Sequence, residues 1–295
     1  MSKAFVIAET ENGARELCAG ARKLADEVVL VTVGAPVAGA ADKSFHIDVP
    51  AGNIADDAYV TVNKIYDAEG GDVVLGEQTL RALSLVGRLA AKLGAAAITG
   101  VSAVEGGVAT SMYFGGTGVR QAKAAGDVSV YTFGAGVFDA AEATGTDAVE
   151  EAAFEAPENA VAKTGSEALP PSDVNLAGAD AIVACGRGFG SEEDLQLARD
   201  LAAKLGAELA CSRPLAEGVD WFPREAYVGV SGAVVSPKVY VAVGISGQMQ
   251  HMVGCNGADV IVAVNKDKNA PVFKACDYGF VGDLKTVLPA LTAAL

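Results

Sequence analysis

The sequence predicts an α/β protein with two domains, each built on a parallel β-sheet. Three observations carry this prediction. Short apolar runs alternate with amphipathic, helix-like segments, the alternation starts again in the second half, and an acidic, proline-containing stretch separates the halves. Short strands that are apolar on both faces are typical of parallel sheets covered by helices. A chain of 295 residues is long enough for two such domains.

The first half is predicted to form the first of these domains. Buried strands are expected at three apolar runs, residues 4–8, 28–33 and 72–76. A helix is expected at about 14–25, between the first two runs. The helix after the third run carries five apolar residues at the spacing of one helix face, Leu80, Leu83, Val86, Leu89 and Ala90. Segments 108–118 and 128–133 are interpreted as irregular strands with glycine turns.

A change of composition near the middle of the chain indicates a connection between the domains. Residues 139–173 contain nine acidic residues, one lysine and three prolines. This composition is typical of a solvated connector, with a docking strip for a basic partner as the alternative. We therefore expect an N-terminal domain at 1–160, an acidic linker at 161–175 and a C-terminal domain at 176–295.

The second half repeats the α/β pattern. A strand at 181–185 leads into a glycine-rich loop, Gly186–Gly190. Ser191 is predicted to cap the next helix, with the acidic residues 192–194 in its first turn and Gly206 at its end. The predicted buried face of this helix consists of Leu197, Ala198, Leu201, Ala202 and Leu205.

The loops after the predicted strands of the second half share a polar, glycine-rich character. Further strands are expected at 207–210, 239–243 and 260–264, and a last helix at 283–295 contains Pro289 as a kink or restart. The loops after the strands are Gly186–Gly190, Ser212–Pro214, Gly244–His251 and Asn265–Asp267. The carboxyl ends of parallel strands meet at one edge of a sheet, where glycine turns and helix N-termini bind phosphate. Together the loops predict a dinucleotide site.

Each motif alone leaves a structural alternative open. Gly186–Gly190 only approximates GxGxxG, and a tight turn without a ligand explains it equally well. Glu208 stands where an NAD-binding unit keeps its ribose acid, although an exposed residue beside a strand is the preferred interpretation. Arg213 is interpreted as a ligand contact rather than a surface ion-pair partner, and His251 as a cofactor contact rather than a helix-start histidine. Gly244–Gly247 does not match the GxSxG nucleophile elbow, which disfavours a serine hydrolase.

Charge and composition exclude several classes of function. With 22 basic and 37 acidic residues the formal charge is −15, which repels nucleic acid and anionic membranes. The five cysteines form no CxxC pair, so we expect free thiols in a reducing compartment. With only two histidines, His46 and His251, a histidine-rich metal site is not expected. No apolar stretch reaches 18 residues, and we expect a cytoplasmic protein.

Several stretches of the second half resemble the flavin domain of the electron transfer flavoprotein α subunit. These are residues 239–251 (VYVAVGISGQMQH), 263–267 (AVNKD) and 270–284 (APVFKACDYGFVGDL), with Gly186–Gly188 and Cys211–Pro214 also in the family's positions. The resemblance covers about residues 178–292. It is looser in the first half, at 87–94 and 113–116. The Ser212–Pro214 motif and the short length are similar to the FixB-like bacterial branch.

The resemblance implies a heterodimer that carries electrons. The C-terminal domain, a doubly wound Rossmann-like domain, would bind FAD non-covalently. A separate β subunit would clamp the FAD and dock flavoenzymes such as acyl-CoA dehydrogenases or reductases. The family's cofactor contacts correspond here to Arg187, Ser212, Arg213, Val228, Gly229, Val230, Ser231, Ser246, Gly247, Gln248, Met249, Gln250, His251, Asn265, Asp283 and Leu284. Of these, Asn265 and Asp283 suit the adenosine half.

The resemblance assigns four of these residues to tuning the flavin. Arg213 would stabilise negative charge on the ring and raise its potential. Gln250 and His251 would donate to the ring carbonyl edge, and Ser231 would hydrogen-bond to N5. Many family members have Gln-Thr where this chain has Val230-Ser231, so the hydroxyl is kept and the amide is lost.

Two alternatives come from other functional classes. An NAD-dependent dehydrogenase on the same frame would need an acid/base group, for which His251 is the only histidine of the second half. A non-redox, adenine-nucleotide-binding subunit would keep a vestigial site, and the complete set of loops argues against it. Electron bifurcation would depend on a second flavin site in the β subunit and is left open.

Overall fold

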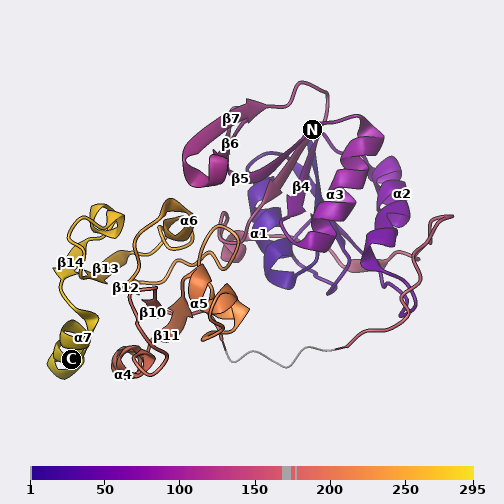
Figure 1. Ribbon diagram of the computed structural model, residues 1–295. Coiled ribbons are helices and arrows are strands. Elements are labelled where there is room, and N and C mark those ends of the chain that lie inside the picture. The colour runs from indigo at the N-terminus through magenta and orange to yellow at the C-terminus, as the bar shows by residue number, and fades with distance from the viewer. Residues whose placement is uncertain (1, 168–173, 177) are drawn as a thin grey trace. The chain divides into compact units, whose positions relative to one another are not determined.

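The computed structural model describes residues 2–167, 174–176 and 178–295, and the chain divides into two compact units near residue 168 (Figure 1). Of the predicted linker, Pro170, Pro171 and Asp173 lie outside the described residues. The described residues 161–167 form no helix or strand, and the Val161 N–H donates to the Asp57 carboxylate at 2.9 Å. This hydrogen bond attaches the start of the segment to the first unit. The predicted domain boundaries stay a prediction.

The first unit is built on a nine-stranded sheet. Its strands are β1 (Lys3–Ala8), β2 (Glu27–Thr32), β3 (Lys43–His46), β4 (Val73–Glu77), β5 (Ala97–Glu105), β6 (Val108–Tyr113), β7 (Gly118–Lys123), β8 (Ser129–Phe133) and β9 (Val149–Glu151). Their order is β7-β6-β5-β8-β4-β1-β2-β3-β9, and only the β5–β6 and β6–β7 pairs are antiparallel. The central strands β1 and β2 are buried from their second residue onward, as a sheet covered on both faces requires.

Strand β9 corrects the interpretation of the acidic stretch. It lies inside residues 139–173 and pairs in parallel with β3, with Val149 opposite Ser44. The Asp147 side chain accepts a hydrogen bond from the Ala41 N–H at 3.0 Å. Residues 149–151 are therefore part of the sheet, and residues 139–151 belong to the first unit rather than to a solvated connector.

Helices cover both faces of the first sheet. They are α1 (Glu11–Arg22), α2 (Tyr59–Glu69) and α3 (Leu80–Leu93), with short 3-10 turns η1 (Ala55–Ala58) and η3 (Ala140–Glu142). A further 3-10 turn, η2 (Phe114–Gly116), connects β6 and β7 along the chain and is grouped with the second unit. The core beneath α1 lies on one face, and the core beneath α2 and α3 on the other. Thr79 caps α3 by accepting from the Ala82 N–H at 3.3 Å. Because this cap puts Leu80 in the first turn, Leu80 is 89% exposed, and its predicted place on the buried face is wrong; Leu85 takes that place.

The second unit is built on a five-stranded, fully parallel sheet. Its strands are β10 (Ala181–Cys185), β11 (Glu208–Cys211), β12 (Val239–Val243), β13 (Val260–Asn265) and β14 (Tyr278–Val281), in the order β11-β10-β12-β13-β14. The register places Cys211, Cys185, Val243 and Val264 in one row. The strand order reverses between β10 and β12, which is where parallel sheets bind their ligands.

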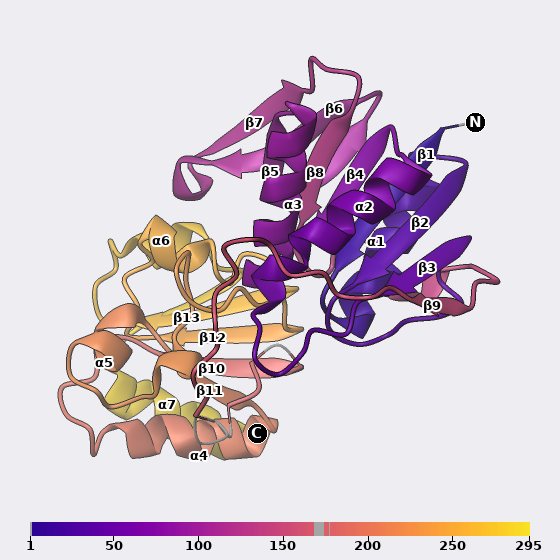
Figure 2. The same ribbon diagram turned by 90° about the vertical axis from the view of Figure 1, so that its right-hand side faces the viewer.

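The second sheet is covered on both faces, which confirms the predicted doubly wound arrangement. Its helices are α4 (Leu195–Leu205), α5 (Arg213–Glu217), α6 (Met249–Met252) and α7 (Leu284–Ala294), with 3-10 turns η4 (Arg224–Ala226) and η5 (Pro271–Lys274). Helices α4 and α7 pack on one face, and α6 lies on the other (Figure 2). Pro289 lies inside α7, which continues through it.

Helix α4 differs from its predicted start. The helix begins at Leu195 rather than after Ser191, because residues 191–194 form a turn that precedes it. Its buried face includes Leu195, and the predicted Leu197 and Leu205 are only half-buried. Gly206 ends the helix with φ of 61°, as predicted.

Candidate functional site

Two adjoining pockets occupy the carboxyl edge of the second sheet. The larger has a volume of about 840 Å³ and the smaller about 230 Å³, and they share Gly188, Gly244 and Asn265. The loops after β10, β11, β12 and β13 line the larger pocket, and the loop after β14 lines the smaller one. All five strand ends therefore contribute to one elongated site, as the sequence predicted for four of them.

Three glycines bring the loops of the switch point into contact. The Gly188 N–H donates to the Gly244 carbonyl at 2.9 Å, and the Gly186 N–H to the Val243 carbonyl at 2.8 Å. A Cβ on Gly188 would lie 2.5 Å from the Gly244 Cα, and one on Gly186 would lie 2.4 Å from the Gly244 oxygen. Side chains are excluded here by backbone. The tight-turn interpretation thus explains Gly186 and Gly188, and Gly188 also lines both pockets.

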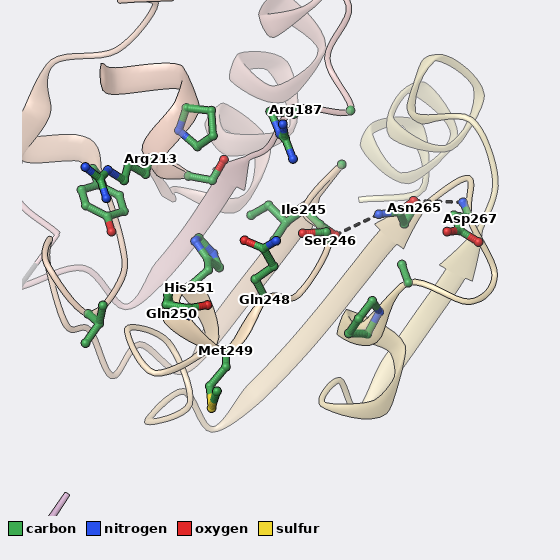
Figure 3. A pocket seen from close by; sticks show the side chains of 18 of the residues that line it. Arg187, Arg213, Ile245, Ser246, Gln248, Met249, Gln250, His251, Asn265 and Asp267 are labelled. Carbon is green, nitrogen blue, oxygen red and sulfur yellow. Dashed lines mark hydrogen bonds between the residues drawn. The ribbon is translucent and has the colours of Figure 1, made fainter. Parts of the chain in front are cut away.

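The loop after β12 is held in place by main-chain and amide contacts. Gly247 has φ of 82°, and a Cβ there would lie 2.2 Å from the Val272 nitrogen. The Asn265 Nδ2 donates to the Ile245 carbonyl at 2.9 Å, and its Oδ1 accepts from the Asp267 N–H at 2.9 Å (Figure 3). Asn265 therefore braces the wall between the two pockets.

Two arginines line the larger pocket. Figure 3 shows Arg187 and Arg213 on one side and His251 and Gln248 on the other, while Met249 points away from the arginines. Arg213 begins α5 and is largely exposed, and its Nε donates to Glu217 at 2.7 Å. Arg213 therefore both forms a surface ion pair and lines the pocket. Within the described part of the chain, no carboxylate forms a salt bridge with Arg187.

His251 is a neutral imidazole in the wall of the larger pocket. It is 8% exposed, and its Nε2 lies 2.9 Å from the hydroxyl of the fully buried Tyr240. Burial lowers the pKa of His251 to about 4, and the main chain of Val228 acts in the opposite direction. Burial also raises the pKa of Tyr240 well above its usual range. The Nδ1 of His251 is buried, and no partner lies within hydrogen-bond geometry of it.

A tyrosine that sequence reasoning missed completes this pocket. The hydroxyl of Tyr227 lies 3.2 Å from the Ser231 Oγ, and both residues line the pocket with the exposed Val230. Tyr227 follows no regular strand, so no pattern marked it. Other lining residues that were not singled out are Pro214, Ile245, Asp267, Ala270 and Pro271.

The smaller pocket is lined by charged groups of both signs. The Asp283 carboxylate caps α7 by accepting from the Lys285 N–H at 2.8 Å. The Lys285 Nζ lies 2.9 Å from Asp194. Leu284 and Lys266 complete the lining with glycines from the loops after β10, β12 and β14. Of these residues, the sequence had singled out Asp283 and Leu284 as cofactor contacts.

The structure does not bring every candidate to the pocket surface. Val228, Gly229 and Gly247 are buried and line neither pocket. Glu208 pairs with Ile182 at the amino end of β11, at the opposite edge of the sheet from the pockets. A role as a ribose acid is therefore wrong for Glu208. The lining that is brought together includes Arg187, Ser212, Arg213, Val230, Ser231, Ser246, Gln248, Met249, Gln250, His251 and Asn265.

These features fit a large, anionic, partly aromatic cofactor. Glycine loops approach one another closely at the switch point, two arginines supply positive charge, and a neutral imidazole lines the wall. Among the described residues no group of His, Cys, Asp and Glu could hold a metal ion. No helix in the described part of the chain is long and apolar enough to cross a bilayer. All five cysteines are free.

Comparison with known proteins identifies the family. Residues 175–256 match the electron transfer flavoprotein FAD-binding domain, and residues 5–159 match the electron transfer flavoprotein domain. The chain is 39% identical to Protein FixB of Escherichia coli O157:H7 and to Protein FixB of Shigella flexneri. Each alignment covers 100% of this chain and 98% of the relative. Protein FixB of Escherichia coli O1:K1 is 38% identical over the same coverage. The chain therefore belongs to the electron transfer flavoprotein family as a FixB-like α subunit, and its cofactor is FAD.

Proposed function

We propose that the chain is the FAD-carrying half of a heterodimer with an electron transfer flavoprotein β subunit. In this proposal the complex takes electrons from flavoenzymes of the acyl-CoA dehydrogenase or reductase type and passes them to another redox protein. The observation that supports it best is the larger pocket, where loops from four strand ends join two arginines, hydroxyls and a neutral imidazole. FAD, when bound, supplies the chemistry of accepting and releasing electrons.

We assign the flavin end of the cofactor to the larger pocket. Arg213 would offset negative charge on the ring and so favour its reduced forms. His251, whose Nε2 is engaged by Tyr240, would lie beside the ring, and Gln250 and Ser231 would add hydrogen bonds.

We assign the rest of the cofactor to the loops around Asn265. Arg187 would hold the diphosphate, because a guanidinium binds phosphate oxygens, and the glycine turns at the switch point would let the diphosphate approach the main chain closely. The smaller pocket, with Asp283, Leu284 and Lys285, would take the adenosine half. Val228, Gly229 and Gly247 would support this binding from behind the wall.

The alternative of a dehydrogenase that uses His251 as an acid or base gains no support. A proton-transferring histidine works best with a pKa near the operating pH, whereas burial lowers the pKa of His251 to about 4. The Nε2 of the ring is also engaged by Tyr240. The free cysteines support a further proposal, that the complex works in a reducing compartment such as the cytoplasm.

Co-production of the chain with its β subunit tests the proposal. We expect a yellow complex with a flavin spectrum, and Arg213→Ala should lower the flavin potential by on the order of tens of millivolts. Arg199→Ala is the matched control, because Arg199 is an exposed arginine of α4 that lines neither pocket. A colourless complex that binds NADH alone contradicts the proposal. An unchanged potential in Arg213→Ala removes the role of that residue.

A further inference from the structure

The side chain of Tyr227 lies where it can control the Ser231 hydroxyl. Tyr227 is 4% exposed, yet it lines the larger pocket, and its hydroxyl lies 3.2 Å from the Ser231 Oγ. Ser231 itself is exposed to the pocket. The pair therefore consists of a fixed, buried hydroxyl and an accessible one.

The loop around Tyr227 holds its ring in one orientation. A Cβ on Gly229 would lie 2.8 Å from the Tyr227 hydroxyl oxygen, and one on Gly232 would lie 2.6 Å from its ring Cδ1. The Ala233 N–H donates to the Tyr227 carbonyl at 2.8 Å, which closes the loop over the ring. Because the ring is packed against glycine backbone, the position of the hydroxyl is set by the fold.

The acidity of the two hydroxyls determines which of them donates. A phenol is a stronger acid than an aliphatic alcohol and is the better hydrogen-bond donor. This difference directs the Tyr227 proton to the Ser231 Oγ, 3.2 Å away. Ser231 is then the acceptor of this bond, and its own proton is left to donate into the pocket.

We propose that Tyr227 is a positioning residue, which directs the Ser231 hydroxyl to donate to an acceptor atom of the bound flavin. This inference rests on the proposed function and adds to it a residue that no sequence pattern marked. A donated hydrogen bond stabilises the flavin more as electron density builds up on the acceptor atom. Tyr227 therefore raises the flavin potential through Ser231 and without a charge of its own.

A double-mutant cycle on the FAD-loaded complex tests the proposal. Tyr227→Phe should shift the equilibrium between oxidised and one-electron-reduced flavin about tenfold toward the oxidised form, ~59 mV lower. Ser231→Ala should lower the potential at least as far. In the Ser231→Ala background the Tyr227→Phe change should have no further effect, whereas in Ser231→Thr, which keeps a hydroxyl, it should persist.

Matched controls separate this role from a loss of packing. Tyr66→Phe removes another tyrosine hydroxyl, one that donates to the Gly71 carbonyl in the first unit, and should leave the potential unchanged. A potential that stays at the wild-type value in Tyr227→Phe overturns the proposal, as does a shift that is equally large without the Ser231 hydroxyl. A complex that binds no FAD overturns the proposed function itself, so the two failures are distinguishable.

Discussion

Acid should destabilise the second unit through His251. The ring is 8% exposed, and burial lowers its pKa to about 4, from an ordinary value near 6.5 in the unfolded chain. The neutral form is favoured in the native state, so this stability is fully present above about pH 6.5. It is lost as the pH falls toward 4, because the unfolded chain then binds a proton that the native chain resists.

The magnitude follows from the size of the shift. A difference of about 2.5 pKa units at ~1.36 kcal/mol per unit gives about 3 kcal/mol over the whole range. Between pH 7.5 and pH 5 the same two pKa values give a loss of about 2 kcal/mol in the free energy of unfolding. Because His251 is buried, solvent screening reduces this figure little.

Urea unfolding of the full chain at a series of pH values measures the effect. Trp221 is the only tryptophan and packs against the core of the second unit, so its fluorescence reports on that unit. FAD is kept at one concentration, since a ligand stabilises the native state. The quantity to compare is the difference in unfolding free energy between wild type and His251→Gln, because the titration of the carboxylates contributes equally to both proteins and cancels. This difference should shrink by about 2 kcal/mol from pH 7.5 to 5. Equal pH dependence in wild type and His251→Gln refutes the reasoning.

Three further predictions follow from packing and hydrogen bonding. Gly188→Ala should lose at least about 1–3 kcal/mol of stability, whereas Gly190→Ala, with no atom nearer than 3.7 Å to the new Cβ, should keep the stability. Equal losses of the two variants in urea unfolding contradict this prediction. Leu85→Ala should lower the free energy of unfolding by about 2–5 kcal/mol, measured in thermal or urea unfolding, and Leu80→Ala by less than about 0.5 kcal/mol. Similar losses in the two variants would mean that the buried face of α3 is assigned wrongly. Tyr240→Phe should cost about 1–3 kcal/mol of stability, because the His251 Nε2 loses its hydrogen-bond partner. The substitution should also move the imidazole ¹⁵N chemical shifts of His251 but not those of His46. Unchanged His251 shifts argue against the Tyr240–His251 hydrogen bond.

The architecture was predictable because parallel strands and their loops leave strong local signals. Residues 4–8 and 181–185 are apolar throughout, and both are buried strands flanked by helices. The strand ends then placed the site, since a parallel sheet aligns them at one edge. Alignment of Cys211, Cys185, Val243 and Val264 in one row is the physical reason that four loops far apart in sequence meet.

The errors came from features that depend on cap geometry. Leu80 fits the apolar spacing of α3, but a cap at Thr79 puts it in the solvent-facing first turn. Ser191 has the composition of a cap, but a turn separates it from α4.

The partners of site residues were beyond sequence reasoning for a different reason. Tyr227 reaches Ser231, and Tyr240 reaches His251, through tertiary packing. Tyr240 reads as an ordinary core residue within an apolar strand, and Tyr227 lies in an irregular segment. Which side chain meets a functional group is decided by loop closure around glycines, and no local pattern encodes that distance.

The most direct test of the central claim is a crystal structure of the complete chain with its β subunit and FAD. We predict that the flavin ring lies in the larger pocket against Arg213, Ser231 and His251, and that the adenosine end lies against Asp283 and Lys285. Electron density for the only FAD at residues outside these two pockets would contradict the claim.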